Sequence, residues 1–192
     1  MKKISIVVPC YNEEKNINNF YEEIIKTLEK VKENYSYEII FVNDGSNDET
    51  EIEVKKIRKT DKNVILISFS RNFGKEAAIY AGLNNATGDL VALIDADLQH
   101  PPITILEMIK GINEGYDVVA TKRKNRKGEP AIKSAFSKLF YKMMRMFIPI
   151  EKNVQDFRLM KKEVVDAILS LKEYNRFSKG IFTWVGFNIK YI

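Results

Sequence analysis

The fold is decided by Leu90-Val-Ala-Leu-Ile-Asp95-Ala-Asp97-Leu-Gln99-His100, in which five apolar residues run into two carboxylates. A continuous apolar run of this length predicts a strand that is covered on both faces, as in a parallel sheet. The residues after such a strand lie at the carboxyl edge of the sheet, where open α/β folds bind their ligands. The stretch therefore predicts both a fold class and the position of a ligand site.

Three oxygen-bearing side chains follow this strand at regular spacing. Asp95, Asp97 and Gln99 are each two residues apart, so in an extended backbone their side chains point the same way. Carboxylate and amide oxygens are suitable ligands for Mg²⁺ or Mn²⁺. The alternative is a polar turn in which the aspartates accept local hydrogen bonds from the backbone. The spacing alone leaves these two interpretations open.

Strands alternate with helices over the first 120 residues. Besides 90–94, strands are predicted at residues 4–8, 37–42, 64–69 and 117–120, and helical patterns lie between them. This alternation predicts a Rossmann-like, mostly parallel sheet flanked by helices. Neither a glycine-rich dinucleotide fingerprint nor a P-loop follows any of these strands. A metal at the aspartates would supply the missing means of holding phosphates.

The composition narrows the chemistry that the chain can carry out. The sequence has one cysteine, Cys10, and one histidine, His100, which excludes an internal disulfide and a site with several histidine ligands. Zinc hydrolysis and Ser-His-Asp catalysis would each depend on His100 alone, so both are poor candidates. At 192 residues the chain is long enough for one well-buried domain, and no apolar run approaches the ~20 residues that span a bilayer.

Lysine and arginine crowd the later part of the chain. The net charge is +5, and Glu129 is the single acid between Lys122 and Arg145. Residues 132–150 place apolar side chains at helical spacing with basic ones mostly between them, which predicts a basic amphipathic helix suited to a membrane surface. The alternative is a surface helix whose apolar stripe packs on the core. Nucleic acid is disfavoured as a partner, because the aromatic residues fall at core spacing rather than as exposed stacking platforms.

Five short motifs occur in order along the chain. They are Val7-Val-Pro9-Cys-Tyr11-Asn12-Glu13-Glu14, Val42-Asn-Asp44-Gly45-Ser46, Arg71-Asn72-Phe73-Gly74-Lys75, Asp95-Ala-Asp97-Leu-Gln99-His100-Pro101-Pro102 and Gln155-Asp156-Phe157-Arg158. Each is weak alone, but in this order they resemble the inverting glycosyltransferases of family 2. The resemblance covers nearly the whole chain. It is strongest to the polyprenyl-phosphate group, alongside dolichol-phosphate mannose synthase and the bactoprenol glucosyltransferases.

The resemblance implies a single catalytic domain of the GT-A (Rossmann-like) fold over residues 1–192. Residues 1–122, in round terms, would form the nucleotide-binding half, and residues 123–192 the half that faces the acceptor and the membrane. Members of the polyprenyl-phosphate group usually carry transmembrane helices after this domain, so we expect such a region to lie outside this sequence. The protein would work at the cell membrane, with its catalytic domain on the cytoplasmic side.

Five residues near the first three strands would bind the nucleotide, according to the resemblance. Pro9, Tyr11 and Glu13 would line the base and ribose pocket, with Tyr11 stacked on the base. Asp44 would accept a hydrogen bond from an N–H of the base, although the same side chain could instead cap the helix that follows it. Lys75 would lie near the edge of the nucleotide, the alternative being a solvated lysine at a helix start.

The resemblance assigns the diphosphate and the transfer step to the aspartate motifs. Asp95 would contact ribose or metal, with Ala96 beside it at the donor, and Asp97 and Gln99 would be the more direct metal ligands. Asp156 is implied as the catalytic base, with Asp97 as a second catalytic residue. A phosphate monoester acceptor has a second pKa of about 6 and is largely deprotonated near neutral pH. Asp156 could therefore orient the acceptor or its cationic partners instead of removing a proton.

Four basic residues complete the implied site. Arg123 and Arg126 would face a diphosphate or the phosphate of the acceptor, and Arg176 with Lys179 would close over the donor phosphates. The alternative for each is plain surface charge in a basic region.

The resemblance further implies metal-dependent transfer of a sugar, with inversion, from a nucleotide-diphosphate donor to a polyprenyl phosphate. Mg²⁺ or Mn²⁺ would be the cofactor, and UDP-glucose is the preferred donor. The alternatives are GDP-mannose as donor, a polysaccharide or other glycan as acceptor, and a non-catalytic module that binds a nucleotide-sugar. Assembly of the chain into a homo-oligomer is a further possibility that the sequence leaves open.

Overall fold

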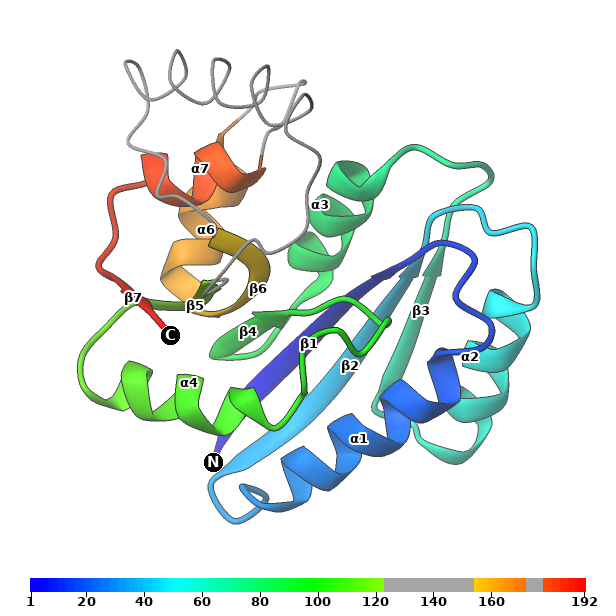
Figure 1. The fold of residues 1–192 in the computed structure, drawn as a ribbon, viewed down its shortest axis with the longest axis horizontal. Coiled ribbons are helices and arrows are strands. Elements are labelled where there is room, and N and C mark those ends of the chain that lie inside the picture. The colour runs from blue at the N-terminus through cyan, green and yellow to red at the C-terminus, as the bar shows by residue number, and fades with distance from the viewer. Residues whose placement is uncertain (123–153, 172–177) are drawn as a thin grey trace, which may run out of the picture.

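The computed structural model describes residues 1–122, 154–171 and 178–192, which form a sheet with helices on both faces (Figure 1). The strands are β1 (Lys2–Cys10), β2 (Tyr35–Asn43), β3 (Val64–Ser68), β4 (Leu90–Leu93), β5 (Val118–Lys122), β6 (Val154–Lys161) and β7 (Ile189–Tyr191). The helices are α1 (Ile17–Glu29), α2 (Thr50–Thr60), α3 (Lys75–Asn85), α4 (Thr104–Asn113), α6 (Lys162–Ser170) and α7 (Ser178–Trp184).

The seven strands form one sheet in the order β3-β2-β1-β4-β6-β5-β7. All neighbouring strands are parallel except at β6, which runs antiparallel to both β4 and β5. The predicted mostly parallel sheet is therefore confirmed. Because β6 runs the opposite way, its first residues lie at the same edge of the sheet as the last residues of β1, β2 and β4.

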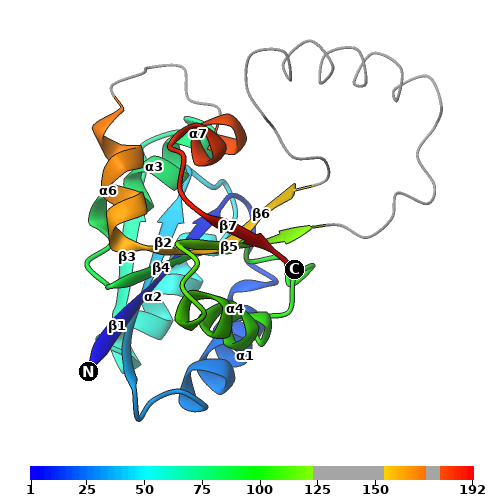
Figure 2. The same ribbon diagram turned by 90° about the vertical axis from the view of Figure 1, so that its left-hand side faces the viewer.

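Two layers of helices cover the sheet (Figure 2). Helices α1, α2 and α4 pack on one face and α3, α6 and α7 on the other, and each face has its own apolar core. The predicted periodicity of α1 is confirmed, because Ile17, Phe20, Ile24 and Leu28 at helical spacing are all buried. Strands that are covered on both faces explain the apolar runs without alternation in the sequence.

Helix α3 packs very closely on the sheet, as its small residues predict. A Cβ atom at Gly82 would lie 2.3 Å from a methyl carbon of Val7 on β1, a distance that no real contact allows. The absence of a side chain at this position therefore sets the spacing between α3 and β1. This spacing also determines where Lys75, the first residue of α3, is held.

The structure differs from the sequence interpretation along β6 and after β4. Residues 154–161 form strand β6, where the sequence analysis predicts no strand. The apolar run before the aspartates ends as a strand at Leu93, so residues 95–99 do not continue β4. The predicted amphipathic helix at 132–150 lies outside the described residues. None of the helices in the described ranges is long and apolar enough to cross a bilayer.

Candidate active site

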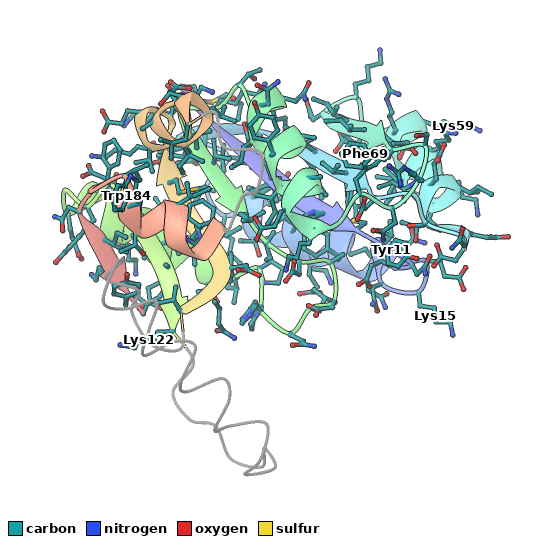
Figure 3. All side chains as sticks on the ribbon, turned by 90° about the horizontal axis from the view of Figure 1, so that it is seen from above. Tyr11, Lys15, Lys59, Phe69, Lys122 and Trp184 are labelled. Atoms are coloured by element: carbon teal, nitrogen blue, oxygen red, sulfur yellow. The ribbon has the colours of Figure 1, made fainter. Side chains whose placement is uncertain are left out.

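A cleft of about 440 Å³ opens at the carboxyl edge of the sheet, above the ends of β1, β2 and β4. In Figure 3 the labelled Tyr11 lies at the opposite end of the molecule from Trp184 of α7. The cleft is lined by Pro9, Cys10, Tyr11, Glu13, Asp44, Asn72, Gly74, Lys75, Ala78, Asp95 and Asp97. The residues expected to bind the base, the ribose and the metal are thus mostly brought to one place.

The two aspartates after β4 reach the cleft through a turn and not through an extended strand. Leu98 adopts a positive φ of 56°, and the backbone N–H of Gln99 donates to Oδ1 of Asp97 at 3.0 Å. The reasoning from alternate residues in an extended backbone is therefore wrong, because the turn breaks the period of two. Asp95 and Asp97 still line the same cleft, whereas Gln99 is exposed and is not part of the lining. The structure therefore has a feature of each interpretation: the local hydrogen bond of a polar turn at Asp97, and two carboxylates that line one cleft.

Lys75 contacts two carboxylates that lie far apart in the sequence. Its Nζ lies 2.8 Å from Asp95, in the turn after β4, and 2.9 Å from Oδ2 of Asp156, near the start of β6. Burial acts to lower the pKa of Lys75, but the hydrogen bonds and charges of Asp95 and Asp156 outweigh it and raise the pKa. Lys75 is therefore a firmly protonated cation between two acids. This contact brings the predicted transfer residue Asp156 to the donor side.

Asp44 fixes the loop that precedes α3. Its carboxylate accepts hydrogen bonds from the backbone N–H groups of Phe73 at 2.7 Å and Gly74 at 2.9 Å, and the residue is only 3% exposed. The alternative role as a cap of α2 is not what the structure shows, because the N–H of Thr50, where α2 begins, donates to Asp48. Asp44 thus lines the cleft while it holds the loop before Lys75 in place.

The loop after β1 presents an aromatic ring to the cleft. Tyr11 is 44% exposed and lines the cleft, so its ring is partly accessible to a ligand there. The next residue, Asn12, has a positive φ of 55° and is held by hydrogen bonds with Ser46 and Asn47. Glu13 accepts a hydrogen bond from the side chain of Asn16 at 2.6 Å. The accessible ring of Tyr11 therefore stands on a fixed backbone.

The remaining predicted residues divide into two groups. Ala96 is 1% exposed and packs in the core beneath the turn, so its side chain does not face the cleft. Arg123, Arg126 and Arg176 lie outside the described residues. Lys179 lies in α7, and its side chain is not among those that the structure describes.

Four lining residues are absent from the sequence interpretation: Cys10, Asn72, Gly74 and Ala78. The first three fall within the quoted motifs, so motif membership is the signal that could have identified them. Cys10 is not a candidate nucleophile, because burial, with smaller contributions from Glu13 and Asp95, raises its thiol pKa well above the ordinary value.

The donor set at the cleft is compatible with Mg²⁺ or Mn²⁺ bound together with phosphates. Asp95 and Asp97 line the same cleft, and no cluster of three or more acidic, cysteine or histidine side chains suited to a metal occurs within the described ranges. Mg²⁺ typically binds one or two carboxylates and completes its octahedron with water and substrate phosphates. Two carboxylates beside an open volume fit such a shared site, whereas they would not form a cage made of protein alone.

The sequence of residues 5–169 matches the glycosyl transferase family 2 domain. The chain belongs to glycosyl transferase family 2. It is 46% identical to the putative glycosyltransferase CsbB of Bacillus subtilis, over 98% of this chain and 57% of that protein. It is also 46% identical to the bactoprenol glucosyl transferase of Shigella phage SfX, over 96% of this chain and 60% of that protein. The predicted family is therefore confirmed.

Solved structures of glycosyltransferases share the fold of this family 2 chain. The mannosyltransferase PcManGT of Pyrobaculum calidifontis, solved with GDP-mannose and Mn²⁺, superposes with a TM-score of 0.67 at 20% identity, over 98% of this chain and 54% of that protein. The GT-A fold expected from the motifs is thus confirmed. The chain spans 57% to 60% of the length of the two curated relatives described above.

Proposed function

We propose that this chain is the catalytic domain of an inverting glycosyltransferase that moves a sugar, preferentially glucose from UDP-glucose, to a polyprenyl phosphate at the cytoplasmic face of the cell membrane. The observation that carries the proposal is the contact of Lys75 with both Asp95 and Asp156 beside the cleft. It joins a donor-side carboxylate to the residue expected at the acceptor. The names of the bactoprenol glucosyl transferase relatives support this choice of sugar and acceptor.

The base and ribose would occupy the end of the cleft at β1 and β2. Tyr11 offers a partly accessible ring, and stacking of a base on an aromatic ring is typically worth about 1–3 kcal/mol. Asp44 already accepts two backbone N–H groups, and a carboxylate has about four acceptor positions, so it retains capacity for an N–H of the base. These residues would hold the donor without a glycine-rich phosphate loop.

The diphosphate would lie over the turn that carries Asp95 and Asp97. A divalent cation bound there would neutralise charge that develops on the departing diphosphate. Asp97, which is not ion-paired with Lys75, would be the main protein ligand and Asp95 the second, because Lys75 already neutralises part of the charge of Asp95.

The transfer itself would be one displacement at the anomeric carbon. A phosphate oxygen of the acceptor forms the new C–O bond while the bond to the diphosphate breaks, and UDP leaves with the electron pair. The acceptor phosphate needs no strong base near neutral pH, since its second pKa is about 6. Asp156 would therefore mainly hold Lys75 and orient the acceptor, and Lys75 would supply positive charge between the two phosphate groups.

A transfer assay tests this proposal directly. The protein, UDP-[¹⁴C]glucose, Mn²⁺ and a short polyprenyl phosphate are incubated, and the product is extracted into organic solvent. We expect labelled lipid with UDP-glucose, and much less with GDP-mannose or without Mn²⁺. Label that stays in water as a glycan would favour a polysaccharide acceptor. Binding of UDP-glucose with neither transfer nor hydrolysis would contradict the enzyme and leave a nucleotide-sugar-binding module.

The membrane contact is proposed for residues 132–150 and is tested separately. We expect the protein to sediment with vesicles that contain anionic lipid at low salt, and the bound fraction to fall as salt screens the lysine and arginine charges. Vesicles made only of zwitterionic lipid are the control. If the protein does not bind anionic vesicles at low salt, this segment is not a membrane-binding helix.

A further inference from the structure

Arg158 is a buried cation that the proposed chemistry does not use. It lies on β6 and is 2% exposed. Its two hydrogen bonds in the described part of the chain go to backbone carbonyls: Nε donates to Asp156 at 3.0 Å and Nη2 to Gln155 at 2.8 Å. Burial lowers the pKa of Arg158 to about 10, against the charge of Asp156, which raises it. Burial of a cation is costly unless its hydrogen bonds are satisfied, so these carbonyl contacts are central to its role.

The two carbonyls belong to a part of β6 where the sheet is irregular. The β5–β6 ladder passes from the Ala120–Arg158 pair to the Lys122–Val154 pair, so three residues of β6 lie opposite Thr121 alone. The β4–β6 ladder ends at the pair between Leu93 and Arg158. Bulges of this kind redirect side chains and are frequent next to active sites. The guanidinium of Arg158 holds the backbone at the bulge.

The planar face of the same guanidinium packs against helix α7. Its central carbon lies 3.7 Å from the centroid of the Phe182 ring. Phe182 is 2% exposed and belongs to the apolar core between α3, α6 and α7. One side chain thus touches both the backbone of Asp156 and the helix that carries Lys179.

We propose that Arg158 is a positioning residue, which holds Asp156 toward Lys75 and makes that placement depend on the seating of α7 against the sheet. The inference rests on the proposed function, since it assumes that Asp156 serves the transfer step. Arginine suits this role because its planar guanidinium can donate to two carbonyls in its plane while its face stacks on a ring. Lysine could keep the charge, but it could not donate two hydrogen bonds in one plane or stack a planar group on the ring.

The test compares Arg158→Met, Arg158→Lys and Phe182→Leu with the unchanged chain in the transfer assay. We expect Arg158→Met and Arg158→Lys to lower kcat about 100-fold, with the donor KM within about twofold, because small misplacement of a reacting group has effects of this size. Phe182→Leu should lower kcat about tenfold, since the two carbonyl hydrogen bonds remain. Amide hydrogen exchange in the peptide 154–161 should become faster in all three variants.

Two matched controls separate positioning from general loss of stability. Arg58→Met removes an exposed arginine from α2, and Phe20→Leu removes a buried ring from the opposite core. Both should keep kcat unchanged, although Phe20→Leu should lower the melting temperature. In the Asp156→Asn background, Arg158→Met should cause no further loss of kcat, because residues that act through one another are not additive.

The outcomes are distinguishable. Unchanged kcat in Arg158→Met and Arg158→Lys, or an equally large loss of kcat in the Asp156→Asn background, would overturn the inference. If Arg158→Met does not fold, Arg158→Lys and Phe182→Leu decide the question. If the unchanged chain transfers no sugar, the proposed function fails, and hydrogen exchange at 154–161 alone then decides whether Arg158 orders this segment.

Discussion

The two edges of the sheet hold carboxylates in opposite circumstances. At the amino edge, Glu38 of β2 is 4% exposed and is surrounded by donors. At the carboxyl edge, Asp44, Asp95 and Asp97 line an open cleft. Among the residues of that lining, Lys75 is the one cation that the structure describes. The same chemical group, a carboxylate, therefore serves stability at one edge and remains available for ligands at the other.

Glu38 has no remaining capacity for a ligand. Its oxygens accept hydrogen bonds from Ser5 Oγ at 2.6 Å, Lys3 Nζ at 2.5 Å, the Thr87 backbone N–H at 2.8 Å and the Thr87 hydroxyl at 3.0 Å. Burial acts to raise the pKa of Glu38, but these hydrogen bonds outweigh it and hold the pKa below its ordinary value. A buried carboxylate with a complete set of donors links β1, β2 and the segment between α3 and β4.

The carboxyl edge differs because acids outnumber cations among the lining residues that the structure describes, next to an open volume. Carboxylates gathered at an open cleft attract a cation, so these side chains suit a divalent metal. The comparison shows that burial of an acid does not by itself mark a binding site. The balance between acids and donors, together with space, distinguishes the two roles.

The largest effect is expected when the metal-side carboxylate is removed from the open edge. Asp97→Ala should lower transfer by about 1,000-fold and weaken UDP binding in Mn²⁺ to the level measured with chelator. Asp156→Ala should lose turnover but keep nucleotide binding, which calorimetry with UDP and Mn²⁺ measures. The control is Asp166→Ala on the exposed side of α6. If Asp97→Ala keeps metal-dependent binding, the assignment of Asp97 to the metal is wrong.

Removal of the carboxylate at the closed edge should act on stability alone. Glu38→Ala leaves Lys3 and Ser5 without their acceptor, and we expect a loss of about 3 kcal/mol in the free energy of unfolding. Urea denaturation followed by circular dichroism measures this loss. At a temperature where the variant is fully folded, transfer should be normal. A large loss of kcat in folded Glu38→Ala would mean that the two edges are not separate.

Neutralisation of Lys75 should have the opposite effect to Glu38→Ala: a loss of transfer with little change in stability. Lys75→Gln should lower transfer about 100-fold, because positive charge between the phosphates is lost. The free energy of unfolding should change by less than about 1 kcal/mol, since the side chain is 44% exposed and exposed ion pairs contribute little. Lys55→Gln on α2 is the control. Normal transfer by Lys75→Gln would show that Lys75 has no role in the proposed site.

The smallest effect concerns pH. Because folding lowers the pKa of Glu38, its contribution to stability is complete above the ordinary glutamate pKa of about 4.3 and is lost as the pH falls through the lowered value. Urea unfolding from about pH 7 to about pH 3 should therefore show a shallower acid decline in Glu38→Gln than in the unchanged chain. Parallel declines would show that Glu38 does not contribute to acid sensitivity.

Local patterns were sufficient to predict the parallel part of the sheet. The apolar run before Asp95 and the helical spacing after Tyr11 identified strands and helices that the structure contains. Both signals depend on neighbouring residues only. The direction of β6 could not be predicted in this way. An antiparallel strand in a parallel sheet is set by pairing with residues far along the chain, such as the Leu93–Arg158 pair. No periodicity within residues 154–161 encodes that direction.

Site residues within a motif could be predicted from the sequence. Contacts between residues that lie far apart in the sequence could not. Tyr11, Asp44 and Asp97 lie together as the motifs predict, whereas the contact between Lys75 and Asp156 joins residues 81 positions apart. Gln99 lies outside the lining of the cleft, after a turn in which Leu98 has a positive φ. Glu38 and Arg158 were not identified as buried, because charged residues in a sequence give no local sign of being enclosed.

The missing side chain at Gly82 makes the site sensitive to a position that has no part in its chemistry. Gly82 lies seven residues after Lys75 on the same helix, about 10 Å along its axis. One added methyl group would meet Val7 and push the helix away from β1. The ammonium of Lys75 would move with the helix, while Asp95 stays in the turn after β4 and Asp156 on β6. A change as small as glycine to alanine would thus alter the distances between these three charges without replacing a residue that lines the cleft.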